Sequence, residues 1–495
     1  MTTSWTDFSR AAMAPAIALL IAGDPTAIDA QTSPTALVQR AATAMGGAAA
    51  LRGLTNMTVE FNSATFGIGQ EETPQSPARA TFTFGRIIND YRGGRRLTSQ
   101  ESRPVAGPVQ RQRTVITPTG GLVDNNGALN PAAPAAITAA AAALRAQPER
   151  LIVEALDNPG QLSAMPPRRV RGELMDGVRI GTGAGAPSLW FDRLSGHLVA
   201  IERVTDDPIL GDRSTETLYT RWEDAGGVML PRQIDVHVNG RLQQHIVVTS
   251  ASINSAVSES DFVIPDSVSA RASAVAPPPA PLTVTLNELG PNVWRAEGGT
   301  HHSLVVRQAT GLVVVEGPQS SARTRAVLDT LRARFPGVAV RTLVPTHHHW
   351  DHTGGIREYL AHVTEVIAHA RNVEFVRGIG AAQKTVAPDA LSRGGRVASV
   401  RAANAQVTIL GAGETAVQLI ELPTTHAQGM LAAYVPSLRI LFVSDVLTPG
   451  PTLAPLGSSE LVAMVRARGL TVDRVVGGHG GIAAWADVER AAAAR

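Results

Sequence analysis

Thr346-His347-His348-His349-Trp350-Asp351-His352-Thr353-Gly354-Gly355 is the stretch that decides how the second half of this chain folds. It carries imidazoles and a carboxylate in the spacing His-x-His-x-Asp-His, and both kinds of donor suit zinc. Residues 340–345 before it are predicted to form a buried strand, and residues 354–360 after it predict the start of a helix. A tight loop between a strand and a helix can turn these ligands toward one point. The stretch therefore predicts a metal site, against the alternative of a solvated histidine-rich loop.

Three later segments each run from a predicted apolar strand into a side chain that can bind a metal. They are Leu422-Pro423-Thr424-Thr425-His426, Ile440-Leu441-Phe442-Val443-Ser444-Asp445 and Val475-Val476-Gly477-Gly478-His479. Together with the first stretch, and in this order, they resemble the metallo-β-lactamase superfamily over residues 283–495. The resemblance implies a hydrolase with an αββα sandwich, and the alternation of predicted strands and helices after residue 311 also fits that architecture.

Carried over residue by residue, the resemblance implies two metal ions that share one carboxylate. One ion would be held by His347, His349 and His426, the other by Asp351, His352 and His479, and Asp445 would bridge them. Ten of the 13 histidines lie at or beyond His301, and five of those ten belong to this ligand set. Five others have no ligand spacing and are interpreted as structural: His197, His237, His245, His362 and His369. By alternation along the stretch, His348 is expected to point away from the ions. With aspartate at the bridging position, this sequence resembles the glyoxalase II, lactonase and phosphodiesterase branches of the superfamily.

The resemblance also implies the chemistry. Two Zn²⁺ ions, or other divalent ions, would lower the pKa of a water toward ~7. The resulting bridging hydroxide would attack an ester, lactone, thioester or amide bond. Asp351, as the catalytic residue, or a metal-bound water would carry the proton. The alternatives are a true β-lactamase, a phosphodiesterase or a sulfatase. Outside the enzymes, the alternative is a periplasmic lipid-binding protein.

Three further side chains are candidates for contacts with the substrate. Lys384 and Arg393 lie between His352 and His426, where a substrate loop often sits in the family, and either cation could hold the carboxylate of a β-lactam. His302, like its neighbour His301, lies beside an early predicted strand and could line the mouth of the site. A solvent-facing or structural role is the alternative for each. Glu316 departs from the family pattern, which usually has Asp there to hold the metal loop, so that contact is left open.

Composition narrows the function classes. A length of 495 residues predicts two or three domains, and 44% hydrophobic with 17% charged residues fit a globular protein with a core. The absence of cysteine excludes disulfides, zinc–thiolate sites and a cysteine nucleophile. The formal net charge is only +2, so we expect no nucleic-acid partner. The partner that the resemblance implies is a small-molecule substrate. Heavy use of Arg and Ala suggests a GC-rich bacterial genome.

The N-terminus predicts export. Arg10 precedes an apolar stretch, residues 11–23, that is too short to span a membrane as a mature helix. Small residues follow, and we expect cleavage after Ala30. The mature protein is therefore predicted to be periplasmic or secreted, with a disordered cytoplasmic leader as the alternative. Since no other apolar run approaches ~18 residues, no stable membrane anchor is expected.

The region between the leader and the metal motifs is predicted to be rich in β-strands. Residues 32–55 predict a helix that Gly46-Gly47 interrupts, and residues 57–265 alternate as short strands with turn signals. Asn239-Gly240 predicts a type I′ hairpin turn, and residues 189–198 predict another hairpin. Residues 132–147 are rich in alanine and predict a helix, or a loosely ordered excursion, across the sheet.

By its pattern alone, this region resembles the half-barrel of periplasmic lipoprotein carriers, a curved antiparallel sheet with a helix in its concavity. The resemblance implies an apolar pocket for acyl chains, and a domain that only buttresses the metal domain is the alternative. The predicted organisation is a signal peptide at 1–30, a β-rich domain at 31–272, a Pro/Ala linker at 273–282 and the hydrolase domain at 283–495. The chain is thus predicted to be α+β, with all its hydrolytic chemistry after the linker.

Overall fold

Short strands joined by tight turns build the N-terminal half into one antiparallel sheet. The computed structural model describes residues 32–104, 108–274, 282–404 and 407–494, so the predicted signal peptide and most of the predicted linker lie outside the described residues. The sheet has 13 strands in the order β6-β5-β4-β3-β2-β1-β13-β12-β11-β10-β9-β8-β7. The turn between β12 and β13 has positive φ at Asn239 (45°) and Gly240 (79°), which confirms the predicted type I′ turn.

The elements of this N-terminal domain are α1 (Pro34–Ala44), α2 (Ala48–Arg52), β1 (Asn56–Phe66), β2 (Ala80–Asp90), β3 (Arg95–Pro104), β4 (Gln110–Thr117), β5 (Gly120–Asn125), β6 (Ala128–Pro131), α3 (Pro134–Arg145), α4 (Pro148–Asp157), η1 (Pro159–Gln161), β7 (Leu162–Val170), β8 (Glu173–Ile180), β9 (Ser188–Asp192), β10 (Leu198–Asp207), β11 (Gly211–Asp224), β12 (Met229–Val238), β13 (Arg241–Ile253), η2 (Glu259–Phe262) and α5 (Asp266–Ala274). The predicted helix at 32–55 is two helices that break at Gly46-Gly47, and the alanine-rich stretch forms α3. Both predictions are confirmed.

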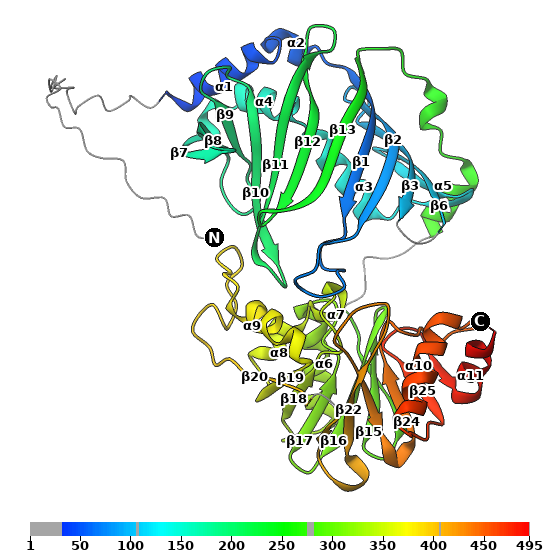
Figure 1. Cartoon of the computed structure of the whole chain (residues 1–495). Coiled ribbons are helices and arrows are strands. Elements are labelled where there is room, and N and C mark those ends of the chain that lie inside the picture. The colour runs from blue at the N-terminus through cyan, green and yellow to red at the C-terminus, as the bar shows by residue number, and fades with distance from the viewer. Residues whose placement is uncertain (1–31, 105–107, 275–281, 405–406, 495) are drawn as a thin grey trace, which may run out of the picture.

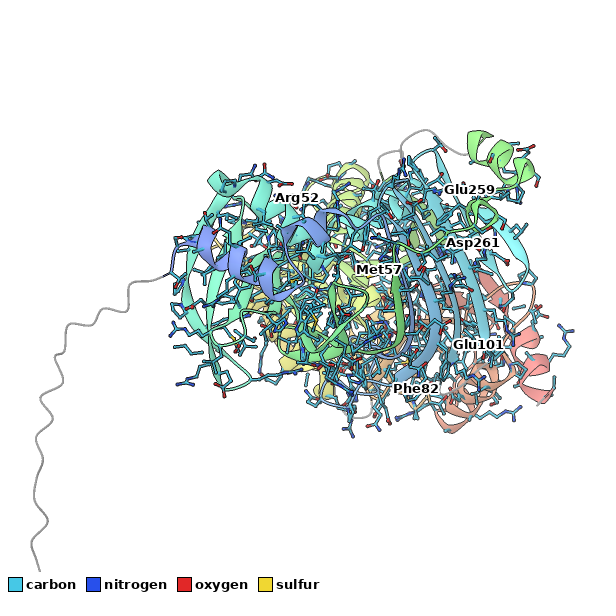
Figure 2. All side chains as sticks on the ribbon, turned by 90° about the horizontal axis from the view of Figure 1, so that it is seen from above. Arg52, Met57, Phe82, Glu101, Glu259 and Asp261 are labelled. Atoms are coloured by element: carbon cyan, nitrogen blue, oxygen red, sulfur yellow. The ribbon has the colours of Figure 1, made fainter. Side chains whose placement is uncertain are left out.

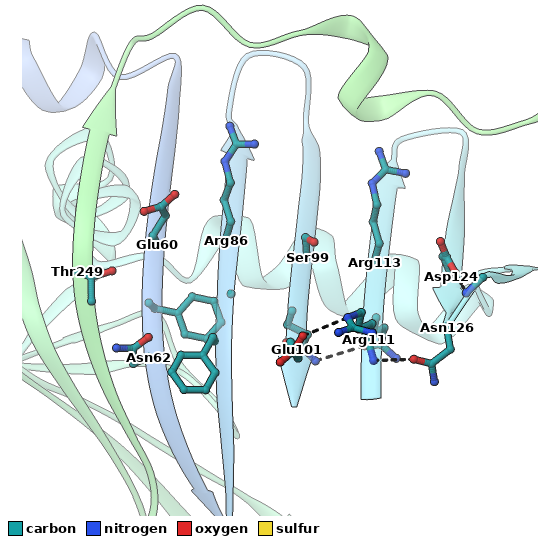
Figure 3. Close-up of a pocket in the computed structure, with 16 residues that line it drawn as sticks. Glu60, Asn62, Arg86, Ser99, Glu101, Arg111, Arg113, Asp124, Asn126 and Thr249 are labelled. Atoms are coloured by element: carbon teal, nitrogen blue, oxygen red, sulfur yellow. Dashed lines mark hydrogen bonds and ion pairs between the residues drawn. The ribbon is translucent and has the colours of Figure 1, made fainter. Parts of the chain in front are cut away.

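Side chains alternate between the two faces of the sheet, and the faces differ in character. Met57, Val59 and Phe61 of β1 line a cavity of about 720 Å³ on the face that α1 and α4 cover. On the opposite face Glu60 and Arg86 belong to an open groove lined by charged side chains, which Figure 3 shows projecting from neighbouring strands. The resemblance to lipoprotein carriers stays a prediction.

The C-terminal domain has two sheets between two layers of helices. Its elements are β14 (Thr285–Gly290), β15 (Val293–Gly298), β16 (His301–Gln308), β17 (Gly311–Val315), α6 (Ser321–Arg334), β18 (Val340–Val344), α7 (Trp350–Thr353), α8 (Ile356–Leu360), β19 (Glu365–Ala368), η3 (Ala370–Asn372), α9 (Val373–Ala381), β20 (Ser399–Ala402), β21 (Val407–Leu410), η4 (Gly413–Thr415), β22 (Val417–Leu422), β23 (Met430–Val435), η5 (Pro436–Leu438), β24 (Ile440–Val443), α10 (Pro455–Ala467), β25 (Arg474–Gly477), β26 (Ile482–Ala484) and α11 (Trp485–Ala493). One sheet is β14 to β20 and the other is β21 to β26, each in chain order.

Three apolar clusters correspond to the three contacts between these four layers. Val306 and Val315 pack against Phe442 in the cluster between the sheets. The first sheet packs against α6, α8 and α9, and the second sheet packs against α10 and α11. Fully buried strands explain why β17 and β24 are continuous apolar runs rather than alternating ones. The α+β class and the αββα sandwich are confirmed.

The two domains meet where strand connections of the N-terminal sheet reach the C-terminal domain (Figure 1). The β10–β11 turn places Ile209 in the apolar cluster around α6, and Asp212 donates its backbone N–H to the Gln383 carbonyl at 2.7 Å. The view from above shows the N-terminal domain covering the C-terminal domain, with Met57 between Arg52 on one side and Glu259 on the other (Figure 2). No helix in the described ranges is both long and apolar enough to cross a bilayer.

Candidate metal centre

Each predicted ligand lies just beyond the end of a buried strand. The histidine-rich stretch follows β18, His426 follows β22, Asp445 follows β24 and His479 follows β25. These strand ends meet at the edge of the sandwich that faces the N-terminal domain, next to α7 (Figure 1). The structure brings all seven predicted ligands together, in two groups whose ligand atoms lie within 4.8 Å of one another.

The first group contains His347, His349, His426 and Asp445. Nδ1 of His349 lies 2.9 Å from Nε2 of His426, and the same His426 nitrogen lies 3.2 Å from Oδ2 of Asp445. Nε2 of His347 is 3.9 Å from that oxygen and is buried without a hydrogen-bond partner. This is the ligand set that the sequence predicted for the first ion.

The second group contains Asp351, His352 and His479, together with His301. Nε2 of His352 lies 3.2 Å from Nε2 of His479, and both nitrogens face Oδ1 of Asp445, at 2.9 and 3.0 Å. Nε2 of His301 lies 3.4 Å from Oδ2 of Asp351. The sequence suggested His301 for the mouth of the site and not as a ligand, and its only signal was its place beside an early strand.

Asp445 stands between the two groups and turns one carboxylate oxygen to each. Burial alone would raise the pKa of Asp445, but hydrogen bonds from His352, His426 and His479 hold it well below the usual range. Burial likewise opposes ionisation of Asp351, and contacts with His301, His352 and Gln70 lower the pKa of that carboxyl. Both carboxylates are therefore anions at neutral pH, as metal ligands must be.

The protonation of the imidazoles fits cation binding. Burial, with His426 nearby, lowers the pKa of His349 to about 4, and burial also lowers the pKa of His347. Since Nε2 of His349 faces the Glu71 carbonyl at 2.9 Å, it must donate there, which leaves the Nδ1 lone pair directed into the first group. Burial would lower the pKa of His352 too, but Glu316, Asp351 and Asp445 raise it to about 12, so a cation at that position displaces a proton.

Residues around the ligands fix their orientation. Glu316, which is 1% exposed, accepts a hydrogen bond from Nδ1 of His352 at 2.9 Å and another from the hydroxyl of Thr346. The Thr300 carbonyl lies 3.1 Å from Nδ1 of His479 and accepts its hydrogen bond. Glutamate thus reaches the metal loop despite its extra methylene, with a backbone φ of 81°. The contact that the sequence left open is present.

The three predicted substrate contacts lie outside both groups. Lys384 forms an ion pair with Asp206 of the N-terminal domain, and Arg393 donates to the Pro388 carbonyl at 2.8 Å. Both line a cleft of about 400 Å³ that none of the seven ligands lines. His302 donates its backbone N–H to the Gly478 carbonyl, and burial lowers its pKa to about 4. Contact of these side chains with a substrate stays a prediction.

Sequence reasoning missed two groups that come from the other domain. The amide of Gln70 donates to Oδ1 of Asp351 at 2.8 Å, and the Glu71 carbonyl accepts from Nε2 of both His348 and His349, each at 2.9 Å. His348, which the sequence expected to point away, belongs to neither ligand group. No local pattern around Gln70 resembles a metal motif.

Comparisons with known proteins agree with this geometry. Residues 296–479 match the family model of the Metallo-beta-lactamase superfamily. The 2,4-dinitroanisole O-demethylase subunit alpha of Nocardioides sp. (strain JS1661) is 27% identical over 201 residues, which cover 40% of this chain and 58% of that protein. This chain therefore spans little more than half the length of that relative.

The solved structures that match part of this chain include metallo-β-lactamases. The enzyme from Hirschia baltica is 17% identical, with a TM-score of 0.33, and the match covers 43% of this chain and 97% of that one. FIM-1 from Pseudomonas aeruginosa, in its mono-zinc form, is 14% identical, with a TM-score of 0.34 and coverage of 43% and 96%. By its match to the family model, the C-terminal domain of this chain is similar to the metallo-β-lactamase superfamily over residues 296–479.

Proposed function

We propose that this protein is a hydrolase that binds two divalent cations, with zinc the expected ion. The observation that carries the proposal is the position of Asp445. Its Oδ1 faces His352 and His479 at 2.9 and 3.0 Å, while its Oδ2 faces His426 at 3.2 Å. A carboxylate whose two oxygens face two groups of imidazoles supports a bridge between two ions.

The donor set supports zinc in particular. Imidazole nitrogens and carboxylate oxygens without any thiolate suit zinc in a catalytic site, where the protein leaves room for water or substrate. The buried Nε2 of His347, which has no hydrogen-bond partner, and the facing ring nitrogens of His349 and His426 are lone pairs that a cation would satisfy. His347, His349 and His426 would hold one ion, and Asp351, His352 and His479 the other.

When bound, the two cations would supply Lewis acidity that acidifies a water nucleophile and polarises the bond under attack. The side chains of this chain orient the reaction. Of the two carboxylates in the ligand set, that of Asp351 is the more exposed, with 43% of its side chain accessible. It is therefore the group that can accept a hydrogen bond from the attacking water and carry its proton. Thr346 and Glu316 hold the metal loop beneath it, and Glu316 keeps Nδ1 of His352 protonated so that Nε2 faces the ions.

The proposed substrates are esters, lactones, thioesters or amides. Elemental analysis of the purified full chain should find close to two zinc ions per molecule after reconstitution. Chromogenic members of each class should then be hydrolysed, and a chelator should abolish that turnover. Only trace metal after reconstitution, or turnover that a chelator leaves unchanged, would sink the proposal.

A second candidate is the cleavage of an activated aryl methyl ether. The observation that favours it is the 27% identity, over 201 residues, to a protein named as a 2,4-dinitroanisole O-demethylase subunit. The same nucleophile and the same ligands would serve both reactions, since an aromatic carbon activated by nitro groups is an electrophile. Hydroxide would add to the ring carbon that bears the methoxy group, the bond from that carbon to the methoxy oxygen would break, and methanol would leave. Release of 2,4-dinitrophenol from 2,4-dinitroanisole, followed by its yellow colour, separates this candidate from the first.

β-Lactams, phosphodiesters and sulfate esters should be tested as substrates alongside the chromogenic esters, lactones, thioesters and amides. The β-lactamase prediction relied on a free cation near the site, and Lys384 instead forms an ion pair with Asp206.

Export is our proposal for the location of the protein, and it rests on the apolar stretch at residues 11–23. Residues 1–30 lie outside the described residues. N-terminal sequencing of the protein from the periplasmic fraction, with a start at Gln31, is the result that export predicts.

A further inference from the structure

The loop between β1 and β2 leaves the N-terminal domain and ends beside the metal centre. In Figure 1 this loop, drawn in blue below the two strands, reaches α7 of the C-terminal domain. Gln70 at its tip donates to Oδ1 of Asp351 at 2.8 Å. The carbonyl of the next residue, Glu71, accepts from Nε2 of His349 at 2.9 Å. Each ligand group therefore has one member that a residue of the other domain holds.

The loop is fixed in this position by contacts on both sides. The Gly69 carbonyl accepts from the backbone N–H of Trp350 at 3.1 Å. Gly69 has a φ of +88°, and a Cβ there would lie 2.3 Å from the indole of Trp350, so only glycine fits. The Glu71 side chain is 2% exposed and pairs with Arg241 from the β12–β13 turn. On the far side, Glu72 accepts the backbone N–H of Gln428 at 2.8 Å.

These contacts act on the two atoms that matter for cation binding. A hydrogen bond at Nε2 of His349 makes Nδ1 the lone-pair atom, and Nδ1 is the atom that faces His426. A hydrogen bond at Oδ1 of Asp351 leaves Oδ2 free to face His301 and His352. Partners of this kind, one bond removed from the ion, set the tautomer and orientation of metal ligands.

We propose that residues 67–79 of the N-terminal domain form a positioning loop for the metal centre, so that the C-terminal domain binds its ions at full affinity only with this loop docked. The proposal rests on the function proposed above, because it concerns the same two ions. It also changes the division of labour that the sequence suggested: every ligand lies after the linker, but the orientation of His349 and Asp351 does not depend on that half of the chain alone.

Two pairs of single substitutions in the full chain test the proposal. Gly69→Ala drives a methyl group into Trp350 and should displace the loop, whereas Gly127→Ala introduces the same strain, at a φ of +90°, where nothing lies within 4 Å. Gln70→Leu removes the amide that contacts Asp351. Its control, Gln112→Leu, removes a comparable 2.9 Å side-chain hydrogen bond to Asn125, far from the metal centre.

The readout is the dissociation constant of each zinc ion, measured by competition with a chromogenic chelator, together with the visible spectrum of the cobalt-loaded protein. We expect Gly69→Ala to weaken both ions about 10- to 100-fold, and Gln70→Leu to weaken one ion by a similar factor. The control variants should bind as the wild type does. Altered cobalt absorption in the loop variants alone would show that ligand geometry, not general stability, has changed.

The outcomes separate this inference from the proposed function. A wild-type protein that binds no zinc refutes the proposed function. A wild-type protein that binds two ions, with Gly69→Ala and Gln70→Leu equal to it in affinity and cobalt spectrum, overturns the positioning role. Gln70 is exposed, so Gln70→Leu is expected to fold even where Gly69→Ala does not, and its result then decides.

Discussion

Arg323 is a buried cation beneath the metal centre, and its replacement by methionine tests how that centre is supported. The side chain is 0% exposed. From α6 its guanidinium donates to the carbonyls of Gly298, Ala296 and His301, at 3.3, 3.2 and 2.9 Å, and to the hydroxyl of Ser303 at 3.1 Å. These acceptors belong to β15 and β16, on either side of the turn that joins the two strands.

The magnitude follows from two opposing effects. Hydrogen bonds from a charged donor contribute about 1.5 to 3 kcal/mol each, so the four bonds together would give a large loss. Arg323→Met also removes the cost of a buried guanidinium that contacts no carboxylate, and burial already lowers the pKa of this side chain. We therefore expect the free energy of unfolding of the C-terminal domain to fall by about 3 to 5 kcal/mol, in the range for breaking buried charged contacts. The melting temperature should fall by about 6 to 20 °C.

Thermal unfolding of the full chain, followed by circular dichroism, measures this loss. Arg325→Met is the matched control, because Arg325 lies on the same helix with a side chain that is 58% exposed and pairs with Glu358. Exposed pairs contribute about 0 to 1 kcal/mol. Arg323→Met should also weaken zinc binding, since the adjacent Thr300 carbonyl holds His479. Melting temperatures for the two variants within about 2 °C of each other, equivalent to less than ~1 kcal/mol, would refute the reasoning.

Further predictions concern the ions and the effect of pH. Asp445→Ala should weaken both ions and lower turnover by orders of magnitude, whereas His349→Ala should weaken one; calorimetric titration with zinc that finds two wild-type sites in Asp445→Ala contradicts the bridge. An excess of chelator should lower the melting temperature, because ions held at 100 times their dissociation constants stabilise the fold by about 2.7 kcal/mol each; an unchanged melting curve argues against structural coupling. The pKa of His302 is about 4 in the folded protein against 6.5 ordinarily, so the unfolded chain takes up its proton first as pH falls. Stability should drop between pH 6.5 and 4, and His302→Asn should remove about 1 to 3 kcal/mol of that drop, as melting curves across this range would show.

The ligand set could be predicted because the fold places it locally. Each ligand sits within a few residues of the end of an apolar strand, so short segments around His426, Asp445 and His479 contain both the strand signal and the ligand. The hairpin at Asn239-Gly240 was predictable for the same reason, since its positive φ values are a property of those two residues.

Groups that act across the fold left no such signal. The bond from Gln70 to Asp351 joins residues 281 positions apart, and a glutamine in a polar loop is typical of any surface. Lys384 is a second example: its position between motifs suggested a substrate contact, which stays a prediction, and the sequence contained no sign that it pairs with Asp206, 178 positions earlier. His301 and His302 are neighbours on one strand, so alternation decides which ring faces the candidate ligand groups, and this cannot be inferred without the register of the strand.

The docking of the β1–β2 loop also sets an order in time. Glu71 precedes His349 by 278 positions, so at about 5 to 20 residues per second a ribosome makes the loop roughly 15 to 55 seconds before the imidazole that it will hold. Glu71, buried against Arg241 in the finished fold, can pair with it long before the metal ligands emerge. The N-terminal domain would then present a folded surface to the newly synthesised histidines. Binding of zinc would be the last step of folding.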